Sequence, residues 1–133
     1  MKLSITKLIF AGVILGLSSA VFAIPDITGN WKCMGYDPMQ KKNYTAAGEI
    51  KKTGDTYSFV NWKDDGSNDA RSGTGIHNNK MKNSLAVMSW SNDNSENVIF
   101  GLYQIQSSNK IVGMWTMKNG KVPAEEICER IKA

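Results

Sequence analysis

The stretch GDTYSFVNW, residues 54–62, is a tight turn followed by an apolar-rich strand that ends in tryptophan. Two later stretches repeat it loosely, NSLAVMSW at 83–90 and NKIVGMW at 109–115, and a fourth tryptophan, Trp31, lies upstream of all three. The tryptophans recur at intervals of 31, 28 and 25 residues, which fits two strands and two turns per unit. Four such units predict an all-β domain of about eight strands.

Residues 1–23 have the pattern of a secretory signal peptide. Lys2 and Lys7 give a positive start, LIFAGVILGL at 8–17 is an apolar run, and Val21-Phe22-Ala23 is a small-x-small cleavage site. The apolar run is too short for a typical spanning helix, although a retained anchor is the alternative interpretation. We therefore expect an exported protein, periplasmic or secreted, with one domain at 24–133 and no membrane span in the mature chain.

The charge of this domain is modest. The whole chain has 16 basic and 12 acidic residues, but Lys2 and Lys7 precede the cleavage site, which leaves a net charge of +2 (16 − 2 − 12). No run of Lys or Arg exceeds two residues in the mature part. Nucleic acid is therefore not an expected partner.

Two cysteines remain, Cys33 and Cys128, one near each end of the domain. An even count in an exported protein predicts a disulfide, and two separate buried thiols are the competing interpretation. A bridge would bring the first and last strands together, since the two Cα atoms must lie within about 7 Å. A meander whose ends meet is a closed barrel.

Apolar alternation and turn residues predict eight strands in an up-and-down antiparallel barrel. The expected ranges are 29–36, 44–52, 56–63, 71–77, 81–89, 98–106, 110–117 and a last strand within 122–133. This last stretch also has the pattern of a helix, with Ile127 and Ile131 four residues apart. We predict a strand there, because a strand places Cys128 beside the first strand and completes the barrel.

The turns, bends and core aromatics resemble a family of small secreted bacterial domains, some of which are labelled fibronectin-binding. The resemblance lies in GNW (29–31), GDTYSFVNW (54–62), SGTGI (72–76), NSLAVMSW (83–90), FGLYQI (100–105) and KIVGMWT (110–116). It implies a calycin-like barrel, the architecture of avidins and lipocalins. The terminal cysteines also resemble those of periplasmic inhibitors of c-type lysozyme, although RSGTG at 71–75 stands where those proteins carry a Ser-Ala-Ser-Gly loop.

Catalytic and metal-binding groups are scarce. His77 is the only histidine and is expected at an exposed turn, and one histidine with two oxidised cysteines gives too few ligands for a transition metal. Acidic residues gather in DDGSNDA (64–70), but their spacing misses that of an EF-hand. No Asp or Glu is expected to be buried with a raised pKa. The sequence therefore predicts no enzyme, no cofactor and no metal site.

The strands at 56–63, 81–89 and 98–106 are apolar on both faces, whereas a small barrel needs only one apolar face inside. In the first of them, Tyr57 and Phe59 are expected on one face and Val60 and Trp62 on the other. In the other two, the sequence does not decide which face points inward. The outward set predicts a contact surface. Its candidate binding residues are Met88, Trp90, Phe100, Leu102 and Tyr103.

Three functions follow as expectations. The first is an exported, non-enzymatic binding protein that recognises a protein partner, or a second copy of itself, through outer strand faces and loops. The second is a lipocalin-like carrier of a small apolar ligand in the barrel interior. The third is a hydrolase that acts on envelope or host polymers. The resemblance alone implies one further alternative, a periplasmic protein like the lysozyme inhibitors.

Overall fold

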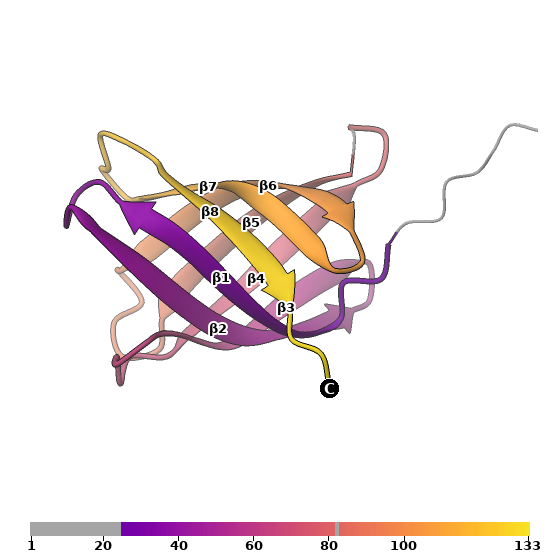
Figure 1. Ribbon diagram of the computed structural model, residues 1–133, viewed down its shortest axis with the longest axis horizontal. Helices are drawn as coiled ribbons and strands as arrows, with labels where there is room; N and C mark the ends of the chain where they lie inside the picture. Colours follow the sequence, from indigo (N-terminus) through magenta and orange to yellow (C-terminus); the bar gives the residue numbers. More distant parts are fainter. Residues whose placement is uncertain (1–24, 82) are drawn as a thin grey trace, which may run out of the picture.

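The computed structural model describes residues 25–81 and 83–133, which form a closed antiparallel barrel (Figure 1). Each strand pairs with its neighbours in sequence, and the last strand also pairs with the first. The strands are β1 (Gly29–Asp37), β2 (Lys42–Thr53), β3 (Thr56–Asp64), β4 (Arg71–Asn78), β5 (Ser84–Ser91), β6 (Val98–Ser107), β7 (Lys110–Met117) and β8 (Ala124–Arg130). The predicted all-β, eight-stranded, up-and-down barrel is thus confirmed, whereas the predicted signal peptide lies outside the described residues.

The disulfide joins the two strands that close the barrel. Cys33 on β1 lies directly opposite Cys128 on β8, with 3.9 Å between their Cα atoms and 1.99 Å between their sulfurs. Both side chains are buried, because residues 31, 33 and 35 of β1 point inward in alternation with Lys32 and Met34. The predicted Cys33–Cys128 bridge is confirmed.

One end of the barrel is closed by two buried side chains, those of Ile27 and Trp31. Trp31 and Ile27 are fully buried there, and the Trp31 indole N–H donates to the Ile27 carbonyl at 2.8 Å. The Arg130 guanidinium stacks over the Trp31 ring at 5.0 Å and donates to the carbonyls of Thr28 and Asp26. The segment before β1 is therefore fastened across this end of the barrel.

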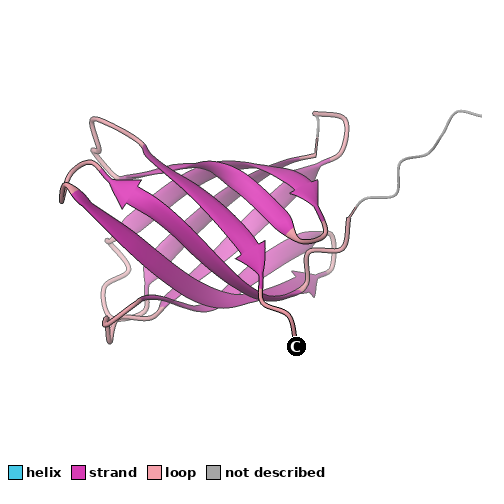
Figure 2. Ribbon diagram, viewed as in Figure 1, coloured by secondary structure: helices cyan, strands magenta, loops and turns pink. Residues whose placement is uncertain are grey.

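The last stretch is a strand, as predicted, and the described residues contain no helix (Figure 2). The described part of the chain accordingly offers no helix long and apolar enough to cross a membrane. The fifth strand begins at Ser84, not at residue 81 as predicted, because the preceding turn is longer. Within this turn the Met81 N–H donates to Asn78 and the Ser84 N–H donates to Met81.

The prediction that Trp62 shares a face with Val60 is wrong. On β3, Phe59 pairs with Gly73 of β4 and Trp62 pairs with Arg71, so β3 has one more residue than β4 over this interval. Such a bulge reverses the alternation. Within the bulge, Asn61 adopts a left-handed backbone conformation with a φ of 53°. Trp62 therefore joins Phe59 inside the barrel, where the ring centroids are 6.0 Å apart.

Candidate functional site

The barrel interior contains a cavity of about 260 Å³. Its rim is formed where β1 meets β2, β3 meets β4, and β5 meets β6, the end of the barrel opposite Trp31 and Ile27. Polar side chains line this rim, among them Asp37, Gln40, Lys42, Lys63, Ser67 and Asn97. Aromatic and apolar side chains line the body, among them Phe59, Trp62, Val87, Ile99, Tyr103 and Trp115. The volume lies just below the roughly 300–1,000 Å³ usual for ligand pockets, so it fits a small molecule.

Glu126 is the centre of the polar groups inside the cavity. Its Oε2 accepts a hydrogen bond of 2.6 Å from the Tyr44 hydroxyl, and its Oε1 accepts one of 2.6 Å from the Tyr103 hydroxyl. The Trp115 indole N–H donates to the Tyr44 oxygen at 2.6 Å, and these two rings meet edge to face. Side chains from β2 and β6 thus donate to the carboxyl group of Glu126 on β8, and a side chain from β7 donates in turn to the first of them.

Two glycines make room for this convergence. Glu126 pairs with Gly35 on β1 and with Gly113 on β7, so neither neighbouring strand places a side chain beside it. A Cβ atom at residue 35 would lie 2.5 Å from the Tyr44 hydroxyl, and one at residue 113 would lie 2.4 Å from the Tyr103 ring. The tyrosines occupy the space that the two glycines leave free, and from there their hydroxyls reach Glu126.

Burial raises the pKa of Glu126, and the two tyrosine hydrogen bonds act in the opposite direction. The negative charge of Asp64, a second acid of the cavity wall, raises the pKa of Glu126 further. Burial and the nearby Glu126 carboxylate also raise the pKa values of Tyr44 and Tyr103, so both hydroxyls stay protonated as donors. The expectation that no acid is buried with a raised pKa is therefore wrong for Glu126.

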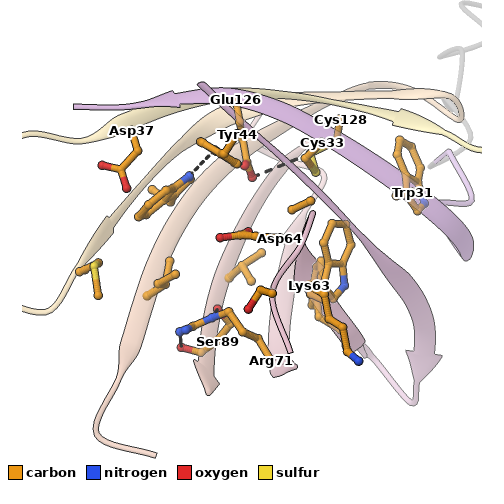
Figure 3. A pocket seen from close by; sticks show the side chains of 18 of the residues that line it. Trp31, Cys33, Asp37, Tyr44, Lys63, Asp64, Arg71, Ser89, Glu126 and Cys128 are labelled. Atoms are coloured by element: carbon orange, nitrogen blue, oxygen red, sulfur yellow. Dashed lines mark hydrogen bonds between the residues drawn. A yellow bond between two sulfur atoms is a disulfide. The ribbon is translucent and has the colours of Figure 1, made fainter. Parts of the chain in front are cut away.

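The wall that faces Glu126 carries Arg71. It lies on β4, four strands away from β8 in the ring of eight, and Figure 3 shows it with Ser89 across the cavity from Glu126, Tyr44 and the disulfide. Its guanidinium donates to the Asn97 carbonyl at 2.9 Å, to the Asn97 side chain at 3.2 Å and to the Ser89 carbonyl at 3.3 Å. These hydrogen bonds tie Arg71 to β5 and to Asn97, the residue that precedes β6.

The structure divides the five candidate binding residues between two sides of the barrel. Met88, Phe100 and Leu102 are exposed on the outer face, and Trp90 lies on the same face, partly buried. Tyr103 points the other way and lines the cavity. The inward set of β5 and β6 is therefore Leu85, Val87, Ile99, Tyr103 and Ile105.

The other groups considered for chemistry do not form a site. His77 lies within β4 and is partly buried, so the expected exposed turn is wrong for it. Cys33, Glu126 and Cys128 bring ligand atoms within 4.8 Å of one another, but both sulfurs are bonded in the disulfide. Among the described residues, the acids of the 64–70 loop do not come together in a comparable group.

No protein-family model matches the chain, and no curated protein matches it significantly in sequence. The functional proposal below therefore rests on the geometry of the cavity.

The sequence interpretation missed Glu126, although one signal pointed to it. Side chains alternate along a strand, so a buried Cys128 implies that the side chain two residues earlier also points inward. The same rule applied to a buried Cys33 places Gly35 inside as well, and Gly35 is the residue that pairs with Glu126.

Proposed function

We propose that this chain is an exported, non-enzymatic binding protein that holds a small ligand inside its barrel. The observation that carries the proposal is the open cavity of about 260 Å³ with polar groups converging on Glu126. Ligand pockets combine apolar walls with a few well-placed polar groups, and this interior has that composition. Catalysis has less support, because His77, the one histidine of the sequence, is not part of the cavity wall.

Two features support the wider setting of this proposal. A buried disulfide fits an oxidising compartment, which agrees with export to the periplasm or beyond. The closed up-and-down topology is the architecture that the calycin resemblance implies. On this basis we also propose that the chain is a calycin-like protein.

Native mass spectrometry and intrinsic tryptophan fluorescence test the proposal directly. Trp62 and Trp115 line the cavity, so a ligand that enters should change their emission. A small-molecule library is screened against wild type and against Ala46→Phe, which fills the cavity from β2. Ala47→Phe is the matched control, because residue 47 pairs with the outward Lys32 and does not line the cavity.

We expect binding to wild type and to Ala47→Phe and its loss in Ala46→Phe. Hits that bind all three proteins equally would contradict an interior site, and a library without hits would contradict small-ligand binding.

The outer face supports a second candidate function, self-association. Ile76, Ala86, Leu102 and Met114 are direct register neighbours across β4 to β7, and Met88 pairs with Phe100 beside them. Ile76 is 64% exposed and Leu102 is 59% exposed, so the apolar row faces solvent. A second copy of the chain offers the same uncharged row, and a two-fold dimer pairs a surface with itself. Sedimentation equilibrium of wild type against Leu102→Lys tests this candidate.

A further inference from the structure

The acids of the cavity wall outnumber its basic residues by one. Four of its residues are acidic, namely Asp37, Asp64, Asp69 and Glu126, and three are basic, namely Lys42, Lys63 and Arg71. The wall therefore has one net negative charge when every group is ionised.

Two of the three basic residues, Arg71 and Lys42, act by charge on Asp64, which is another acid of the wall. Arg71 is held by Asn97 and Ser89, and its charge acts on Asp69 and Asp64. Lys42 and Lys63 are exposed at the rim. Among the described residues, the salt bridges lie outside the cavity, so no cation contacts Glu126, and the nearby charge that acts on it is the acid Asp64.

Glu126 also has free capacity for a ligand. A carboxylate has about four lone-pair sites, and the two tyrosine hydroxyls occupy two of them. The side chain keeps accessible surface, and it is part of the cavity wall.

Aromatic rings surround this carboxylate. Tyr44 and Trp115 lie with their ring centroids 5.9 Å apart, and Tyr103 completes the group from β6. Aromatic faces attract cations within about 6 Å, and this attraction grows in a site shielded from water. Below the carboxylate, the wall continues with apolar side chains, including Phe59, Trp62 and Val87.

We infer that the ligand is a small organic cation, a protonated amine with an apolar or aromatic body, whose ammonium group binds Glu126 among Tyr44, Tyr103 and Trp115. This inference rests on the proposed interior binding function. The ammonium group would donate to the free lone pairs of the carboxylate, and the apolar body would lie against the rings of Phe59 and Trp62.

The electrostatics of the cavity agree with a cationic ligand. Burial raises the pKa of Glu126, so ionisation of this group costs free energy in the protein without ligand. A bound ammonium group offsets that cost, and amine binding should therefore lower the pKa of Glu126.

Three probes of similar shape test the inference by titration calorimetry at neutral pH: phenethylamine, 2-phenylethanol and 3-phenylpropionate. We expect the amine to bind wild type about tenfold or more tightly than the alcohol, because a hydrogen bond between an ammonium group and a carboxylate is charge-assisted and stronger than a neutral one. The carboxylate probe should bind most weakly. Glu126→Gln should lose the preference for the amine, whereas the matched Glu125→Gln, exposed on the same strand, should keep it.

A second measurement does not depend on a variant. The carboxyl ¹³C signal of Glu126 in wild type should titrate at a lower pH with phenethylamine than without it. Equal affinities for amine and alcohol, or an unchanged Glu126 titration, would overturn the cation inference and leave interior binding intact. Failure of all three probes, together with a screen without hits, would overturn both.

Discussion

The Oε1 atom of Glu126 lies 3.8 Å from the sulfur of Cys128, so the acid at the centre of the cavity and the disulfide occupy the same seam of the barrel. This seam joins β8 to β1, strands that are 95 residues apart in sequence at the bridge. The disulfide therefore fixes the strand that carries Glu126 relative to the strand that carries Gly35. We therefore expect that reduction of the disulfide would loosen the position of Glu126 in the cavity.

The first prediction concerns this bond. The double variant Cys33→Ala/Cys128→Ala should lose about 4 kcal/mol of unfolding free energy, because the bridge closes a loop of nearly the whole domain. Urea denaturation followed by tryptophan fluorescence measures the difference. Wild type made in an oxidising compartment should show no titratable thiol in denaturant. Two thiols per chain, or equal denaturation midpoints for variant and wild type, would contradict a barrel fastened at this seam.

The second prediction concerns pH. Glu126 has a folded-state pKa raised above its ordinary value of 4.5, so the folded protein holds this proton more tightly than the unfolded chain does. Its contribution to the unfolding free energy should be largest at low pH. The contribution should decline as pH rises from about 4.5 through the raised pKa. Glu126→Gln cannot ionise, so its stability should lack this decline.

The control for that experiment is Glu125→Gln, one residue away and exposed. Unfolding free energies of the three proteins are compared between pH 4 and pH 8. The groups that act on the Glu126 pKa, namely Tyr44, Tyr103, Trp115 and Asp64, are unchanged in all three. Parallel pH profiles for wild type and Glu126→Gln would show that Glu126 titrates normally.

The third prediction concerns Gly101, which the Tyr103 ring covers. A Cβ atom at residue 101 would lie 2.3 Å from the Tyr103 ring, so Gly101→Ala should destabilise the barrel by about 1–3 kcal/mol through overpacking. The cost should shrink in a Tyr103→Ala background, where the ring is absent. A double-mutant cycle of unfolding free energies measures this coupling. Additive costs would mean that Gly101 is not needed for the position of Tyr103.

The fold could be predicted from the sequence because its signals are local. Alternation within strands, turn residues between them and two cysteines near the ends were enough to predict the closed barrel and the Cys33–Cys128 bridge. The inward turn of Trp62 could not be predicted, because it depends on a bulge against β4.

The site was harder to predict because its signals are not local. Glu126 lies in the charged stretch AEEICER of β8, which has the composition of an exposed segment. Its partners Tyr44 and Tyr103 are 82 and 23 residues away in sequence. Only the register of the barrel brings these three side chains together.

The last prediction separates the two faces of β5 and β6. Val87 points into the cavity and pairs with Gly101, whereas Leu102 is 59% exposed and lies in the outer apolar row. Val87→Asp should lower the melting temperature strongly, because its carboxylate loses hydration inside the barrel and adds to the net negative charge of the cavity wall. Leu102→Lys should melt close to wild type, since its charge stays in water. If Leu102→Lys also converts a dimer to a monomer in sedimentation equilibrium, the outer row is a contact surface. If Leu102→Lys unfolds the barrel as Val87→Asp does, the row is buried on both sides and the proposed dimer surface does not exist.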